Sequence, residues 1–177
     1  MTNTPWSDWV SESPFELRFR LPFVDYDGAD GPYETVRFCG LKAADFAIVD
    51  PSRQVLYLLE VKSAEWFLID KASDWDAKVC DLFRCFIDSL GICARLTDSQ
   101  WQDVRDAART YQVQLVLFAG DHPGDPEAPM IFAETIRRYL RKKLRALDIE
   151  PFVLVETLPH QTRELFEARI EDDQRAP

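Results

Sequence analysis

Two apolar segments that lie close together constrain this chain more than any other feature. Residues 44–50 read Ala-Asp-Phe-Ala-Ile-Val-Asp, and residues 55–62 read Val-Leu-Tyr-Leu-Leu-Glu-Val-Lys, with four residues, Pro-Ser-Arg-Gln, between them. β-Branched and aromatic residues favour strands. Pro and Ser are good turn residues, and a four-residue connection suits an antiparallel hairpin. We therefore predict that the two segments form a β-hairpin.

This hairpin would bring two acids and a lysine together. Side chains two positions apart on a strand share a face, so Glu60 and Lys62 point the same way. If the four intervening residues form the loop, Asp50 faces Val55, and counting back places Asp45 opposite Glu60. Directly opposed residues have Cβ atoms roughly 4.5–5.5 Å apart. The spacing therefore predicts one cluster made of Asp45, Glu60 and Lys62.

Such a cluster is costly without a cation. Two adjacent carboxylates repel each other, and Lys62 offsets only part of that repulsion. Carboxylate oxygens suit Mg²⁺ or Mn²⁺, and Mg²⁺ keeps several waters and so leaves room for a substrate phosphate. Lys62 would then orient or deprotonate an attacking water. A salt bridge on a half-exposed sheet is the alternative, but the register and the flanking apolar runs favour a metal site.

The same residues resemble a known nuclease signature. Asp45 on one strand and Glu60-Val61-Lys62 on the next are similar to the PD-(D/E)xK motif of restriction endonucleases and Holliday-junction resolvases. The resemblance covers roughly residues 33–119. It implies a restriction-endonuclease-like α/β fold with a mixed central sheet flanked by helices. It also implies Asp45, Glu60 and Val61 as ligands of Mg²⁺ or Mn²⁺, catalysis by Asp45, Glu60 and Lys62, and hydrolysis of DNA in repair, restriction or phage defence.

The chain departs from this family pattern at several positions. Ala44 stands where relatives often have Pro, and the N-terminal part reads as strand rather than as a helix carrying an acidic ligand, so Glu16 and Glu34 are the substitutes that we consider. Lys78 is the candidate for the basic residue that relatives carry on the next helix, with a solvated lysine as the alternative. Asp76-Ala-Lys78 also matches the acid-x-Lys motif, but in a predicted helix, where residues two apart diverge.

The rest of the sequence predicts alternating strands and helices in a single domain over residues 1–177. We expect strands over 15–24, 33–39, 113–119 and 152–157, either a strand or a helix over 165–170, and helices over 73–90, 98–111 and 129–147. Residues 1–14 would form an N-terminal arm and 171–177 a flexible tail. The architecture is therefore expected to be mixed α/β with one central sheet.

The formal net charge of -10 argues against DNA binding over the whole surface, because Lys and Arg supply most of the affinity for phosphates. Six basic residues on the last predicted helix answer this objection: Arg137, Arg138, Arg141, Lys142, Lys143 and Arg145. They would track a phosphate backbone, although basic residues near a helix C-terminus also suit the macrodipole and a solvated surface. We predict DNA as the partner, with a protein partner or a homodimer also considered.

Several classes of protein are disfavoured. No run approaches the ~18 apolar residues of a membrane span, and no signal peptide is visible, so we expect a cytoplasmic protein with reduced, buried cysteines. There is no Cys-x-x-Cys pair for zinc and no Gly-rich phosphate loop. His122 and His160 lie near no recognisable nucleophile. The alternative function is an inactive nuclease-like fold that acts as a protein-binding or regulatory subunit of the inhibitor or immunity type, which the acidic charge favours.

Overall fold

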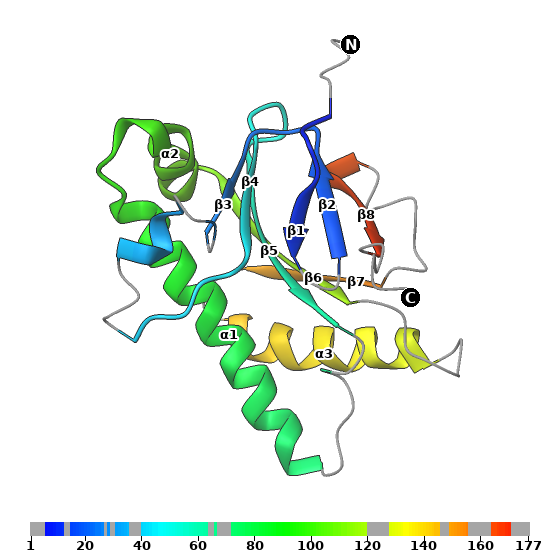
Figure 1. Cartoon of the computed structure of the whole chain (residues 1–177). Helices are drawn as coiled ribbons and strands as arrows, with labels where there is room; N and C mark the ends of the chain where they lie inside the picture. The colour runs from blue at the N-terminus through cyan, green and yellow to red at the C-terminus, as the bar shows by residue number, and fades with distance from the viewer. Residues whose placement is uncertain are drawn as a thin grey trace.

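Two β-sheets and three α-helices make up the computed structural model, which describes residues 6–12, 15–26, 28, 31–35, 40–63, 66, 72–119, 128–145, 149–155 and 164–170 (Figure 1). The fold is mixed α/β. In chain order the elements are β1 (Val10–Glu12), β2 (Phe15–Phe19), β3 (Phe23–Asp25), the 3₁₀ helix η1 (Pro32–Thr35), β4 (Phe46–Asp50), β5 (Val55–Lys62), α1 (Ala72–Arg95), the 3₁₀ helix η4 (Ser99–Trp101), α2 (Gln102–Thr110), β6 (Gln112–Ala119), α3 (Ala128–Leu144), β7 (Glu150–Val155) and β8 (Phe166–Ile170).

The larger sheet has the strand order β3-β4-β5-β6-β7. Its first three strands are antiparallel, whereas β5, β6 and β7 run parallel to one another. The predicted hairpin is present, and Asp50 pairs with Val55 across a four-residue turn. The Asp50 carboxylate accepts the main-chain N–H groups of Ser52 and Arg53 at 2.9 and 3.0 Å, which stabilises the turn.

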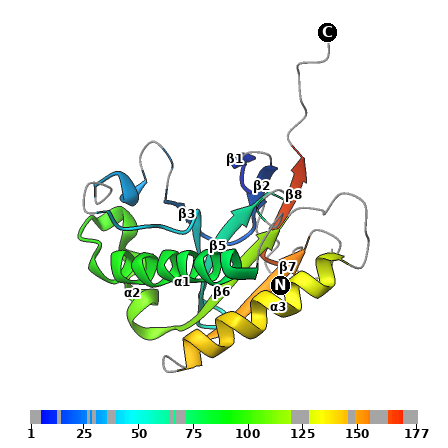
Figure 2. The same cartoon turned by 90° about the horizontal axis from the view of Figure 1, so that it is seen from below.

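The two faces of this sheet are covered differently. On one face, Leu56 and Leu58 of β5 belong to the same core as Phe86 of α1 and Leu140 of α3. On the other face, Leu59 and its neighbours pack against the smaller sheet. Figure 2 shows the helices on one side of the large sheet and the β1, β2 and β8 strands on the other. Coverage of both faces explains why β5 is a nearly continuous apolar run.

The smaller sheet has the order β1-β2-β8, so the prediction of one central sheet was wrong. β2 alternates as expected, with Phe15, Leu17 and Phe19 buried. However, it pairs with β8, which lies about 150 residues later, rather than with its neighbours β3 and β4. Since β1 begins at Val10, part of the predicted N-terminal arm is a strand of this sheet.

Arginine and tryptophan side chains attach the N-terminal segment to the small sheet. The Arg18 guanidinium lies 5.1 Å from the ring centroid of Trp6 and 4.7 Å from that of Trp9. Arg169 of β8 lies 4.1 Å from the Trp9 centroid. Such cation–π contacts contribute about 0.5–1 kcal/mol each at exposed sites, so several of them together hold this short segment in place.

The predicted strand over residues 15–24 is in fact two strands in different sheets. β2 ends at Phe19, β3 begins at Phe23, and Pro22 lies between them. Pro has no N–H to donate to a ladder, but the Pro22 carbonyl accepts the N–H of Val49 at 2.9 Å. The predicted strand over 33–39 was also wrong where the structure describes it, because Pro32–Thr35 is a 3₁₀ helix; residues 36–39 lie outside the described part.

Helix α1 is longer than predicted and continues through Gly91 to Arg95. Ile92 and Cys93 after the glycine are buried in the helix-side core, and this burial offsets the roughly 1 kcal/mol that Gly costs in a helix. The other helices and strands differ from the predicted bounds by a few residues, and 166–170 is a strand.

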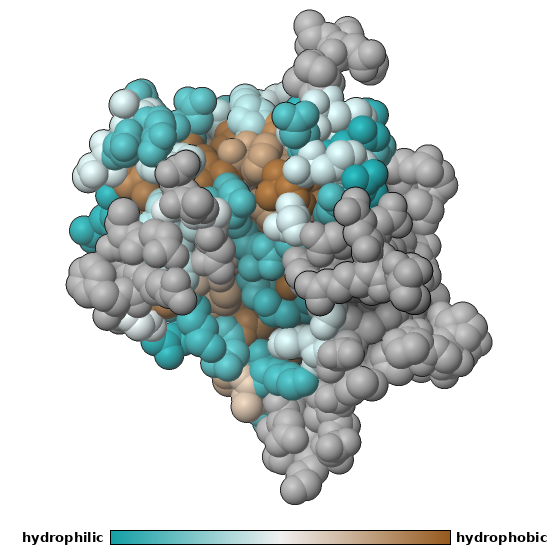
Figure 3. All heavy atoms as spheres, viewed as in Figure 1, coloured by the Kyte–Doolittle hydropathy of each residue, from teal (hydrophilic) through white to brown (hydrophobic). Residues whose placement is uncertain are grey.

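The surface is mixed in polarity. Figure 3 shows hydrophobic patches separated by hydrophilic side chains on the described part of one face, as is normal for folded proteins. Among the described helices, none has both the length and the apolar character that a membrane crossing requires.

Candidate functional site

Asp45, Glu60 and Lys62 come together on the helix-covered face of the large sheet. Asp45 directly precedes β4, and the pairing of Phe46 with Leu59 places it opposite Glu60, as the loop length predicted. The main-chain N–H of Val61 donates to Asp45 Oδ2 at 2.6 Å, which ties the first acid to the strand that carries the other two residues. The hairpin alone therefore builds the cluster.

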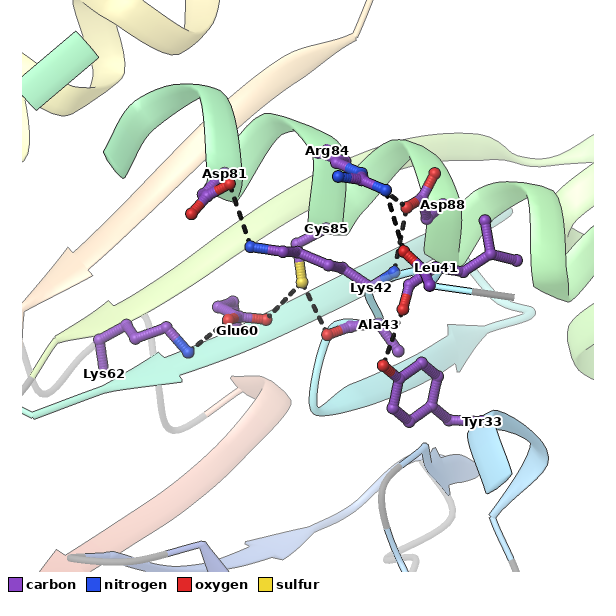
Figure 4. A network of polar contacts seen from close by, with 11 residues as sticks. Tyr33, Leu41, Lys42, Ala43, Glu60, Lys62, Asp81, Arg84, Cys85 and Asp88 are labelled. Carbon is purple, nitrogen blue, oxygen red and sulfur yellow. Dashed lines mark hydrogen bonds and ion pairs between the residues drawn. The ribbon is translucent and has the colours of Figure 1, made fainter. Parts of the chain in front are cut away.

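Glu60 is held by one residue on its own strand and one on α1. Its Oε1 forms an ion pair with Lys62 Nζ, and its Oε2 accepts a hydrogen bond from the Cys85 thiol, with the two atoms 3.2 Å apart. Cys85 Sγ also lies 2.6 Å from the carbonyl oxygen of Ala43. Figure 4 shows Glu60 between Lys62 and Cys85 in this network. Helix α1 thus closes over the acids and orients one of them.

The two acids are nearly inaccessible, whereas the lysine reaches solvent. Asp45 is 8% and Glu60 5% exposed, but the side chain of Lys62 is 27% exposed. A phosphate approaching from solvent would therefore meet the ammonium group first. Opposite charges buried at this depth stabilise each other only if their geometry is good, and the contacts of Glu60 satisfy that condition.

Burial raises the pKa of Asp45 well above its ordinary value, and the charge of Glu60 raises it further, whereas Lys62 lowers it. Glu12 of β1 is a further acid whose charge raises the pKa of Asp45. Burial lowers the pKa of Lys62, but Glu60 and Asp45 outweigh this effect and leave the Lys62 pKa raised. In the metal-free state, burial and Glu60 therefore disfavour the ionised form of Asp45, whereas Glu60 and Asp45 favour the charged form of Lys62.

These properties decide which of the expected roles fit. The ammonium of Lys62, whose charged form is favoured by Glu60 and Asp45, can orient a water or stabilise an anion. Asp45 and Glu60 offer carboxylate oxygens on one face, which suits a small divalent cation that keeps several waters. Val61 can contribute only its main-chain oxygen. Within the described residues, no group of three or more His, Cys, Asp or Glu side chains is arranged to hold a metal.

The proposed substitutes for missing family residues make other contacts where the structure describes them. Glu16 is on the small sheet, where it forms an ion pair with Arg169, and the side chain of Glu34 lies outside the described part. Lys78 donates to the carbonyl oxygen of Trp66 and lies 5.2 Å from the centroid of its ring. Trp66 itself packs against the helix-side core. These contacts give Lys78 and Trp66 structural roles.

The basic residues of α3 lie at the other end of the sheet. Arg138, Arg141, Lys142 and Arg145 line an open groove together with Gln112, Glu134 and Ile149, which we call the α3 groove. Arg137 forms an ion pair with Glu134 at 3.0 Å. The side chain of Lys143 lies outside the described part. Four of the six predicted residues thus share one surface.

Cys85 is the contact that sequence reasoning missed. The apolar stretch that contains Cys80 and Cys85 predicted buried thiols, which is confirmed for Cys85 but wrong for Cys80, which is exposed. Burial of Cys85 and the charge of Glu60 raise the pKa of its thiol, so it remains a neutral donor. Nothing in the local pattern indicates which residue it contacts, because Glu60 lies 25 positions away in the chain.

Comparisons with protein-family models, with curated proteins and with solved structures found no match. The fold is therefore described by its own architecture, a mixed α/β arrangement of two sheets and three helices over the described residues. The resemblance to the PD-(D/E)xK nucleases stays a prediction that depends on the local sequence pattern and on the geometry of the cluster.

Proposed function

We propose that this protein is a metal-dependent phosphodiesterase that acts on DNA and has a restriction-endonuclease-like arrangement. One observation supports the proposal most strongly. The register of β4 and β5 puts Asp45, Glu60 and Lys62 on one face, and the main-chain N–H of Val61 donates to Asp45 Oδ2 at 2.6 Å. Two carboxylates and an ammonium in this arrangement supply metal ligands and a cation for an anionic substrate.

Asp45 and Glu60 would hold Mg²⁺ or Mn²⁺, with the main-chain oxygen of Val61 as a further ligand. Such an ion lowers the pKa of a bound water and neutralises phosphate charge. Lys62, whose side chain is partly exposed, would hold its ammonium toward the attacking water or a phosphate oxygen. Cys85 keeps its hydrogen bond to Glu60 and so limits the rotation of that carboxylate.

Protonation of Asp45 opposes the binding of a cation. Because the pKa of Asp45 is raised, the cation must displace a proton until the pH exceeds that pKa. Metal affinity and cleavage should therefore both rise with pH and level off once Asp45 is fully ionised. This pH dependence follows from the burial of the site and is independent of the choice of substrate.

Cleavage of plasmid, linear duplex and single-stranded DNA and of RNA, with Mg²⁺ or Mn²⁺, tests the proposal. We expect Lys62→Ala to lose roughly a hundredfold or more in rate, as is typical when a group that stabilises transition-state charge is removed. Lys42→Ala is the matched control, because the Lys42 side chain is 42% exposed and its ion pair, at 3.0 Å, is with Asp81 of α1. Equal cleavage by wild type and Lys62→Ala would contradict the assigned mechanism.

A second function is favoured by the internal contacts of the acids. Asp45 is bonded by Val61, and Glu60 by Lys62 and Cys85, so the cluster has partners within the protein. Such a cluster suits an inactive nuclease-like fold that serves as a protein-binding or regulatory subunit. Thermal unfolding with Mg²⁺ or Mn²⁺ separates the two functions, since a ligand at 100 times its Kd stabilises by about 2.7 kcal/mol. Absence of any metal-dependent shift would support the second function.

A further inference from the structure

The α3 groove concentrates positive charge on an acidic protein. Its volume is about 770 Å³. Arg138, Arg141, Lys142 and Arg145 occupy positions i, i+3, i+4 and i+7, so they form one stripe along α3 and just beyond its end. At 1.5 Å per residue, the stripe is roughly 10 Å long. The chain as a whole carries a formal charge of -10, so this local excess of cations is a departure from the rest of the molecule.

The stripe is held in a defined orientation. On the opposite side of the helix, Ile136, Leu140 and Leu144 are fully or almost fully buried in the helix-side core. This burial prevents α3 from rotating about its axis, so the cations face outward together. Glu134 is the acid in the groove, and its side chain is 65% exposed and paired with Arg137. Its negative charge is therefore partly neutralised within the protein.

The groove lies far from the acids. Gln112, which lines the groove, pairs with Val55 at the start of β5, whereas Lys62 is at the far end of that strand. Seven residues at about 3.3 Å each separate the two ends by roughly 23 Å. At 3.4 Å per base pair, this distance corresponds to roughly seven base pairs of a duplex. The groove therefore does not hold the phosphate that meets Lys62.

We propose that the α3 groove binds the phosphate backbone of double-stranded nucleic acid. A stripe of roughly 10 Å spans about three phosphates of one strand at 3.4 Å per phosphate along the axis. Three of its four cations are arginines, whose planar groups bind phosphate through two parallel hydrogen bonds. The groove thus suits a regular row of phosphates. That this duplex is also the substrate cleaved at the cluster of Asp45, Glu60 and Lys62 rests on the proposed function.

Fluorescence anisotropy with a labelled duplex of about 24 base pairs tests the groove without catalysis, because EDTA removes divalent cations. The double variant Arg141→Ala/Arg145→Ala should bind at least tenfold more weakly than wild type. Its plot of log affinity against log salt should be shallower by about 1.8, or 0.9 for each lost phosphate contact. Arg84→Ala/Arg109→Ala is the matched control, since both arginines are exposed on other helices, and it should bind as wild type does.

Three outcomes would overturn the proposal: no salt-dependent binding by wild type, equal binding by wild type and the groove variant, or equally tight binding of poly-glutamate, which would indicate an acidic protein partner. Circular dichroism of each variant checks that the exposed substitutions leave the fold intact. The binding assay in EDTA distinguishes this proposal from the proposed function, because it requires neither a divalent cation nor cleavage. Wild-type binding without cleavage under Mg²⁺ or Mn²⁺ would contradict the nuclease and leave the groove supported.

Discussion

Replacing Asp45 with Asn should stabilise the metal-free protein at neutral pH. The two side chains have nearly the same shape, and an Asn oxygen can still accept the N–H of Val61, which Asp45 Oδ2 accepts at 2.6 Å. The substitution therefore removes an acid whose ionised form is disfavoured by burial and by Glu60, while keeping the hydrogen bond. Replacing an acid that is kept for function rather than for stability should raise the free energy of unfolding.

The magnitude follows from the spacing of the charges. Opposed residues on paired strands have Cβ atoms about 5 Å apart, and two unit charges at that separation interact by roughly 3 kcal/mol at an effective dielectric constant near 20. Lys62 offsets part of this repulsion in the wild type, since it also attracts Asp45. We therefore expect Asp45→Asn to raise the free energy of unfolding by about 1–2 kcal/mol at about pH 8.

The pH dependence has a definite sign. The pKa of Asp45 is raised in the folded state, so the folded protein binds this proton more tightly than the unfolded chain. The stability that this proton contributes is fully present below the unfolded pKa of about 3.9 and is lost as the pH rises through the folded pKa. The advantage of Asp45→Asn should therefore be largest at alkaline pH and should vanish near pH 4.

Urea unfolding followed by tryptophan fluorescence in EDTA measures this difference. Asp81→Asn is the control, because Asp81 is 66% exposed and pairs with Lys42, and such substitutions change stability by less than about 0.5 kcal/mol. Addition of Mg²⁺ should stabilise the wild type but not Asp45→Asn. A loss of about 1 kcal/mol or more in Asp45→Asn at pH 8, or a difference that does not vary with pH, would refute the reasoning.

Three further predictions concern packing, backbone strain and thiol reactivity. Phe118→Ala should lower the free energy of unfolding by about 3–5 kcal/mol, because the ring is buried edge-to-face against two phenylalanines of the small sheet; a loss below about 1 kcal/mol in urea titration would contradict this packing. Gln54→Gly should raise the free energy of unfolding by about 0.5 kcal/mol, because Gln54 has a φ of 55°, which favours Gly. A lower free energy of unfolding in urea titration would be evidence against backbone strain at this residue. Cys80 is exposed and should react with Ellman's reagent in the native protein, whereas Cys85 and Cys93 should react only on unfolding, since both are buried and burial raises the pKa of Cys93 to about 11; peptide mapping by mass spectrometry would show native labelling of either buried thiol if this is wrong.

The hairpin and its cluster could be predicted from sequence because every step was local. Strand side chains alternate with a period of two, and the four-residue loop sets which residues face each other. Asp45, Glu60 and Lys62 therefore share a face whatever the rest of the chain does, and Asp50 pairs with Val55 as counted. The helices and the strands β6 and β7 were also indicated by their apolar patterns, with bounds that differed by a few residues, whereas the parallel pairing of these strands was not predicted.

Long-range packing decided the features that could not be predicted. The alternation of β2 gave its buried face but not its partner, and Phe15 pairs with Ile170 near the other end of the described chain. Helix α1 continues through Gly91 because burying Ile92 and Cys93 in the core contributes more free energy than a helical glycine loses.

The surroundings of the cluster and of the basic stripe were decided in the same way. Cys85 meets Glu60 only because α1 packs over β5, and the basic stripe of α3 lies at the opposite end of the sheet from Lys62 because β6 and β7 run parallel to β5. Sequence alone therefore determined what neighbouring residues could build together. The tertiary structure decided which distant surfaces met, since that choice depends on the summed free energy of burying all of them at once.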